Sequence, residues 1–135
     1  MTVIVDTNVV LDVLLGREPF LDVATRVFES VEHGHVKGLL CATSVTTVDY
    51  LLARFLSLEK RRETLRCLLS VFDVAPVNRA VIDEALRSRI TDFEDAVVEQ
   101  SGRLAGADAV VTRDTRDFRR SSIKVLAPDE LLGSL

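Results

Sequence analysis

The sequence predicts an α/β fold in which a central, mainly parallel sheet carries helices on both faces. Short runs of β-branched and apolar residues alternate along the chain with segments whose apolar residues recur at helical spacing. Alternating strands and helices are typical of parallel sheets covered on both sides. At 135 residues, with 47% hydrophobic and 28% charged residues, the chain has the size of one domain with one core. We therefore expect residues 1–135 to form a single domain.

The N-terminal half is predicted to contain two strands and four helices. The β-branched run Thr2–Val5 forms the first strand, and the apolar segment Val9–Leu15 forms a short buried helix that ends at the turn 16–19. From Leu21 to about Gly34, apolar residues recur at helical spacing, which predicts a second helix. A strand over Gly38–Ala42, a helix capped by Thr43 or Ser44 and a helix over Leu58–Val71 follow.

The C-terminal half is predicted to contain three short strands and three helices. Capping residues and a proline mark where the helices begin. The expected elements are a strand over Phe72–Ala75, a helix from Asn78 to about Ile90, a helix from Asp92 to about Gly106, an inner strand over Ala107–Thr112, a strand over Lys124–Leu126 and a closing helix over Asp129–Leu132 with Pro128 in its first turn.

Composition and targeting signals limit the classes of function. No basic region leads into an apolar stretch at the N-terminus, and no apolar run approaches the roughly 18 residues of a membrane span, so we expect a cytoplasmic protein. Cys41 and Cys67 lack C-x-x-C spacing and are expected to be buried thiols. The formal net charge of −4 argues against binding nucleic acid through overall basicity, although a local basic patch remains compatible with it.

Other α/β functions lack their sequence signals. The chain has neither a G-x-x-x-x-G-K-[ST] loop nor a G-x-G-x-x-G motif after the first strand, which argues against ATP or dinucleotide binding. A phosphoacceptor domain of the signalling type also uses acids at strand ends. Here, however, VDTN supplies one acid instead of a pair, and Lys124 alone does not carry that analogy.

Acidic residues follow two predicted strands and open one predicted helix. Asp6 follows the first strand, and Asp114 lies two residues after the strand Ala107–Thr112. Because ligands of parallel sheets collect at the carboxyl ends of the strands, we expect these two acids to meet at one edge. In TDFEDA, Asp92 and Asp95 have a spacing that places both on one helix face. Helix capping explains each acid singly, but Ser, Thr or Asn would serve there equally well.

Converging carboxylates favour a divalent cation. Like charges at close range repel and raise one another's pKa, and a cation removes that cost. Oxygen ligands without nearby Cys or His favour Mg²⁺ or Mn²⁺ over zinc, since His33 and His35 lie in a separate, exposed loop. A metal held by carboxylates activates water and neutralises charge on phosphate oxygens, which suits phosphodiester hydrolysis.

Three segments resemble the PIN-domain ribonucleases, especially the VapC-like toxins of toxin-antitoxin pairs. VDTNVVLDVLL, DFEDAVVEQ and GADAVVTRDTRDF occur in the family's order and span nearly the whole chain. The resemblance implies a three-layer α/β/α domain, metal-dependent cleavage of single-stranded RNA, and Mg²⁺ or Mn²⁺ held by acids. It also implies a homodimer and a small antitoxin protein whose tail fills the acidic groove.

The resemblance assigns roles to individual residues. Asp6, Asp95 and Asp114 match the family's catalytic, metal-holding acids. Asp92 and Asp117 lie beside matched positions, Asp92 as a further candidate metal ligand and Asp117 as an additional acid. Thr7 and Asn8 are expected to support the carboxylates by capping or hydrogen bonding.

One position departs from the family pattern. The family often carries a glutamate on the helix after the second strand, and in SVTTVDYLLAR the corresponding residue is Thr47. Asp49 is a candidate substitute two residues later, but helix positions two apart point nearly opposite ways. Asp49 would face the metal only if the helix began late or its register shifted. The alternative function is therefore a catalytically impaired PIN-like module that binds RNA or a protein partner without cleavage.

Two groups of basic residues are candidates for RNA contact. Arg113 and Arg116 flank Asp114 and are expected to hold phosphates near the metal, so that binding weakens with salt. A second group on the central helices is expected to be a solvated face, because Glu59 and Glu63 are interspersed among Arg54, Lys60, Arg61, Arg62 and Arg66. One Tyr and no Trp give no support to an aromatic stacking platform.

Overall fold

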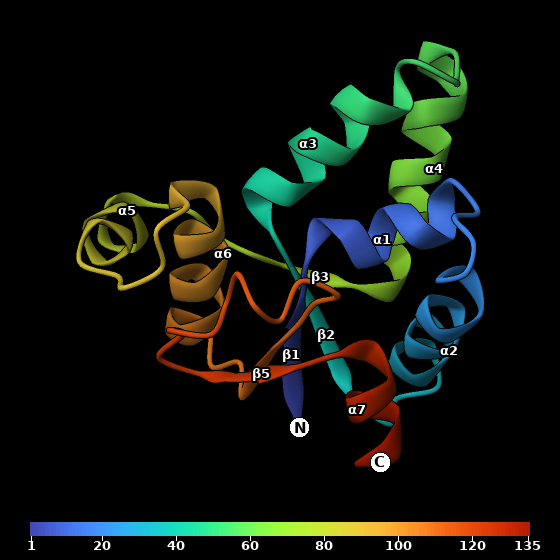
Figure 1. Cartoon of the computed structure of the whole chain (residues 1–135). Coiled ribbons are helices and arrows are strands. Elements are labelled where there is room, and N and C mark those ends of the chain that lie inside the picture. The colour runs from blue at the N-terminus through green and yellow to red at the C-terminus, as the bar shows by residue number, and fades with distance from the viewer.

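The computed structural model describes residues 1–135 and contains a five-stranded sheet and seven helices (Figure 1). The strands are β1 (Thr2–Val5), β2 (Lys37–Cys41), β3 (Asp73–Ala75), β4 (Ala109–Val111) and β5 (Lys124–Leu126). The helices are α1 (Thr7–Leu14), α2 (Leu21–Glu32), α3 (Ala42–Leu52), α4 (Leu58–Val71), α5 (Arg79–Leu86), α6 (Phe93–Leu104) and α7 (Pro128–Gly133). The strand order is β3-β2-β1-β4-β5 and every pairing is parallel, which confirms the predicted fold class.

Two hydrophobic cores lie on opposite faces of the sheet. Because side chains alternate along a strand, Val3 and Val5 of β1 enter one core and Ile4 enters the other. The first core is closed by α1, α2, α3, α4 and α7, and the second by α5 and α6. Figure 1 shows α5 and α6 on one side of the sheet and the other helices across from them. The result is three layers, with β1 buried at the centre.

The caps of α1 and α6 and the close packing of α6 on β1 position the elements that carry the acidic residues. Asp6 caps α1 by accepting a hydrogen bond from the backbone N–H of Thr7, with 2.9 Å between the atoms. Asp92 caps α6 in the same way. A β-carbon at Gly102 of α6 would lie 2.6 Å from Cγ2 of Ile4, so glycine lets α6 pack directly on β1. Both helix starts are thereby held at the same edge of the sheet.

Three sequence predictions need correction. Helix α3 begins at Ala42 instead of after a Thr43 or Ser44 cap, because these residues continue the helix and the Thr43 carbonyl accepts the Thr47 hydroxyl. Helix α5 ends at Leu86 and not at Ile90, which leaves a longer loop before α6. Cys67 is exposed, because the neighbouring Leu68 is the residue of α4 that enters the core.

None of the seven helices has both the length and the apolar character needed to cross a membrane.

Candidate active site at the carboxyl ends of β1 and β4

A cavity of about 250 Å³ opens where β1 and β4 end and where α1 and α6 begin. Acidic side chains dominate its lining, and no Lys, Arg or His side chain lines it. Its acids are Asp6, Asp92, Glu94, Asp95, Asp114 and Asp117. The structure therefore brings together Asp6, Asp95 and Asp114 from three separate parts of the chain, as the resemblance implies.

Asp6 and Asp114 are linked through Thr112, which the sequence analysis did not single out. The buried Thr112 hydroxyl donates to Oδ2 of Asp6 at 2.8 Å and accepts the backbone N–H of Asp114 at 2.9 Å. The strand register explains the contact: Val5 pairs with Val111, so the next residue of each strand lies side by side. A threonine directly after an inner strand was the only sequence signal for this role.

The side chains that begin α1 orient the same two carboxylates. The N–H of Thr7 binds Oδ1 of Asp6, and Nδ2 of Asn8 donates to Oδ2 of Asp114 at 2.5 Å. Both Thr7 and Asn8 line the cavity. Each of the two acids at the strand ends is therefore held by polar partners from a neighbouring segment.

The start of α6 contributes the remaining acids. Oδ1 of Asp92 accepts the backbone N–H of Asp95 at 3.0 Å, while Asp95 itself is half-buried. Glu94 also lines the cavity, and its Oε1 lies 3.5 Å from the hydroxyl of Thr47 on α3. Glu94 was not among the site residues predicted from the sequence, although it stands in the motif DFED beside Asp95.

Burial, and after it electrostatic repulsion, raises the pKa of two acids in the cavity. Burial raises the pKa of Asp6, and the charges of Asp114 and Glu94 add to this, against hydrogen bonds from Thr112 and Thr7. The pKa of Asp95 is raised to about 7 by partial burial and then by the charges of Asp6, Asp92, Asp117 and Glu94. Bound positive charge would relieve this repulsion.

The cavity fits a hydrated divalent cation in donor chemistry and in charge. All its candidate ligands are oxygen atoms, as hard cations prefer. No three His, Cys, Asp or Glu side chains form a ready-made group of ligands for one ion. A cation here would therefore bind one or two carboxylates directly, with water molecules as its other ligands, as Mg²⁺ commonly does. Asp6, Asp95 and Asp114 are the residues able to hold it.

Asp49, the candidate substitute for the missing glutamate, lies outside the cavity. Its Oδ1 accepts a hydrogen bond from Nε of Arg61 in α4 at 3.2 Å. Thr47 does line the cavity, and α3 begins early rather than late, so the register shift that Asp49 required does not occur. The acid that approaches Thr47 comes from α6 instead.

Arg113 is engaged in a structural contact and does not line the cavity, contrary to its predicted role with phosphates. Its Nε and Nη2 bind the two carboxylate oxygens of buried Asp12 at 2.6 and 3.2 Å. Its guanidinium also lies 3.9 Å from the ring centroid of Phe20. Arg116, in contrast, is exposed and lines a hollow next to the acidic cavity.

Comparison with known proteins identifies the fold and the family of the chain. No curated protein matched the chain. FitAcB from Neisseria gonorrhoeae is 20% identical, with a TM-score of 0.69 over 93% of this chain and 97% of that chain. VapBC-1 from nontypeable Haemophilus influenzae is 11% identical, with a TM-score of 0.72 over 96% and 99%. VapC20 from Mycobacterium tuberculosis, described as a sarcin-ricin loop cleaving toxin, is 16% identical, with a TM-score of 0.67 over 90% and 98%.

These structures share the fold of the chain at low sequence identity. The sequence profile of the PIN domain matches residues 2–116, which include β1, β4 and all six acids except Asp117. The chain therefore belongs to the PIN-domain family.

Proposed function

We propose that the protein is a metal-dependent endoribonuclease that hydrolyses phosphodiester bonds of single-stranded RNA. The observation that carries the proposal is the acid-lined cavity, in which Asp6, Asp95 and Asp114 meet at the carboxyl ends of β1 and β4. Membership of the PIN-domain family supports the same activity.

The acidic side chains would hold Mg²⁺ or Mn²⁺, with Asp6, Asp95 and Asp114 as ligands and Asp92 close by. When bound, the ion supplies activation of a water molecule and neutralises charge that grows on the phosphate. Thr112 and Asn8 keep Asp6 and Asp114 in fixed orientations through the hydrogen bonds described above. The carboxylates would also accept the proton that the attacking water loses.

Cleavage of a labelled single-stranded RNA by purified protein, with and without Mn²⁺, tests the proposal. Wild-type protein is expected to cut only with the cation, and Asp6→Asn or Asp95→Asn is expected to abolish cutting while far-ultraviolet circular dichroism stays unchanged. Cleavage that persists in both variants would assign the activity to a contaminant or another site. Calorimetric titration supplies a second readout, because absence of binding at millimolar Mn²⁺ would refute the metal site.

We further propose that the protein is the toxin of a cytoplasmic toxin-antitoxin pair. The support is its fold, shared with FitAcB, VapBC-1 and VapC20. A homodimer and a small antitoxin as partner belong to this proposal. Expression of the wild type, but not of Asp95→Asn, should arrest growth, and co-expression of a small protein encoded by the adjacent gene should restore it. Light scattering of the purified protein tests the dimer.

A binding module without catalysis is the second candidate function. The observation that favours it is Thr47, which occupies the cavity where the family often has a glutamate. This function predicts RNA or protein binding that is insensitive to Mn²⁺ and shows no turnover. The cleavage experiment above separates the two functions directly.

A further inference from the structure

We propose that a groove beside the acidic cavity binds the phosphates of the RNA strand next to the bond that is cut. This inference rests on the proposed nuclease function. The groove, about 470 Å³, is lined by Arg89, Arg116, Arg119 and Arg120. It shares Asp92, Asp95 and Asp117 with the acidic cavity, so the two hollows adjoin. Its arginines come from the loop between α5 and α6 and from the segment between β4 and β5.

The four arginines are free to bind an anion. All four are exposed, and none lies within ion-pair distance of a carboxylate, whereas Arg61, Arg87, Arg103 and Arg113 are all paired. The groove acids lie on the side shared with the cavity, while Arg89 and Arg120 continue into a further hollow of about 560 Å³. The charge therefore changes from negative at the proposed metal site to positive along the groove.

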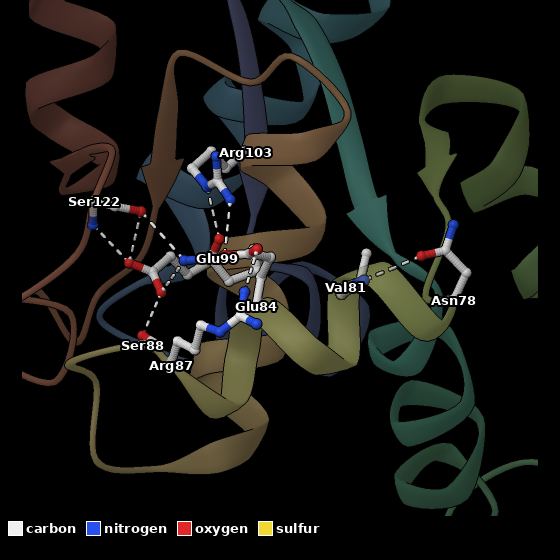
Figure 2. A network of polar contacts seen from close by, with 9 residues as sticks. Asn78, Val81, Glu84, Arg87, Ser88, Glu99, Arg103 and Ser122 are labelled. Atoms are coloured by element: carbon white, nitrogen blue, oxygen red, sulfur yellow. Dashed lines mark hydrogen bonds and ion pairs between the residues drawn. The ribbon is translucent and has the colours of Figure 1, made fainter.

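A buried carboxylate holds the two arginine-bearing segments in place. Oε1 of Glu99 on α6 accepts the Ser88 hydroxyl at 2.5 Å, and Oε2 accepts the Ser122 N–H at 2.6 Å and its hydroxyl at 3.0 Å (Figure 2). Ser88 precedes Arg89 directly, and Ser122 lies two residues after Arg120. Burial would raise the pKa of Glu99, but these hydrogen bonds and one from Gln100 outweigh it and lower the pKa. Glu99 is a positioning residue for the groove.

The lining favours a nucleic-acid backbone as the ligand. Guanidinium groups bind phosphates through paired hydrogen bonds. Ile90 is the only hydrophobic residue of the groove and no aromatic side chain lines it, so bases have no stacking surface there. Contact would be through phosphates alone and would not depend on sequence. An RNA strand bound along the arginines would lead to the adjoining acidic cavity, where its cleavage is proposed.

Binding of an uncleavable RNA tests the groove separately from catalysis. We would measure fluorescence anisotropy of a labelled 2′-O-methyl dodecanucleotide in EDTA, over a range of salt, for wild type and R89Q/R120Q. The Kd of the variant should rise about tenfold, and the slope of log K against log salt should fall by about 1.4, the value for two lost contacts to a single strand. R62Q/R66Q removes the same charge from exposed positions of α4 and should behave as wild type.

The outcomes distinguish the groove from the nuclease function. R116Q/R119Q provides a second groove variant in case the first disturbs the loops, and thermal unfolding identifies such a disturbance. Equal affinity of groove and control variants, or no RNA binding by the wild type, would overturn the groove. Groove-dependent binding without Mn²⁺-dependent cleavage would refute the nuclease and keep the groove. If the groove variants bind RNA as the wild type does but lose binding to a polyglutamate peptide, the ligand of the groove is an acidic protein and not RNA.

Discussion

Asp95 is the residue in which stability and the proposed activity conflict most directly. Its pKa of about 7 in the folded protein exceeds the ordinary value of 3.8, so the folded state binds its proton more tightly than the unfolded state. Between these two values, stability therefore falls as pH rises. The charged carboxylate is a cost to the metal-free fold, and that cost is complete above about pH 7.

Replacement of Asp95 by asparagine should stabilise the metal-free protein more at high pH than at low pH. Solvent screening at this half-buried site reduces the effect, so we expect the gain in unfolding free energy to be about 1 kcal/mol larger at pH 8 than at pH 5. Urea denaturation in EDTA measures this difference. Asp22→Asn, at an exposed acid in the first turn of α2, is the matched control and should show no such pH dependence. An equal gain at both pH values would contradict the raised pKa of Asp95.

Two acids, Glu94 and Asp49, are candidates for the role of the glutamate that Thr47 replaces, and they differ in position. Glu94 lines the acidic cavity beside Thr47, while Asp49 is paired with Arg61 outside it. We expect Glu94→Gln to lower kcat/KM by about 10- to 100-fold, as loss of a supporting polar group near a metal does. Asp49→Asn should stay close to wild type. If Asp49→Asn lowers kcat/KM more than Glu94→Gln does, Asp49 takes the role of the missing glutamate.

The sequence predicted the acids at strand ends better than it predicted their partners. Asp6 and Asp114 follow from the rule that ligand sites lie at the carboxyl ends of parallel strands, whereas Asp95, in the first turn of α6, was predicted from the resemblance to the PIN-domain family. Thr112 and Glu94 were missed because their contacts depend on strand register and on the approach of α3 to α6, neither of which is encoded locally. Arg113 was misassigned because its partner, Asp12, is 101 residues away in the chain.

Among the elements, α1 and the segment after β4 are joined by the Asp12–Arg113 pair. Asp12 is buried, and removal of Arg113 takes away both hydrogen bonds to its carboxylate and leaves only Arg17, 3.8 Å away, as a charged partner. We expect Arg113→Ala to lower the free energy of unfolding by about 3 kcal/mol. Urea denaturation tests this, with Arg79→Ala as the control: Arg79 forms an exposed pair with Asp83, which contributes less than about 0.5 kcal/mol. If both variants lose a similar amount of unfolding free energy, the buried Asp12–Arg113 pair stabilises the fold no more than the exposed pair does.

Helix boundaries were predictable where local capping chemistry decides them. The predicted caps Asn78 and Asp92 begin α5 and α6, and each accepts a backbone N–H from the first turn of its helix. At α3 the same reasoning failed, because Thr43 and Ser44 suit a cap but lie inside the helix. Ser44 is buried there without a hydrogen-bond partner, so tertiary packing overrides its local preference.

At the scale of the whole molecule, charge separation would let an acidic protein bind the RNA strand proposed as its substrate. The net charge is −4, but the charges are unevenly distributed: an acid-lined cavity adjoins a groove with four unpaired arginines. The alternation of strands and helices predicted a mainly parallel sheet with helices on both faces, but not the order of its strands. It did not predict the groove, because the arginines come from two segments that only the packed fold brings together.

If the cavity binds a cation as proposed, cation binding is linked to the stability of the whole fold. A cation that binds only the folded state raises the free energy of unfolding, by about 2.7 kcal/mol when its concentration is one hundred times Kd. Mn²⁺ should therefore raise the Tm of the wild type, and EDTA should reverse the shift. In Asp95→Asn the repulsion and a ligand are both removed, so this variant should start from a higher Tm at pH 8 and respond less to Mn²⁺. Asp49→Asn should respond as the wild type does, and a Tm of the wild type that does not change with Mn²⁺ would contradict a metal site at the end of β1.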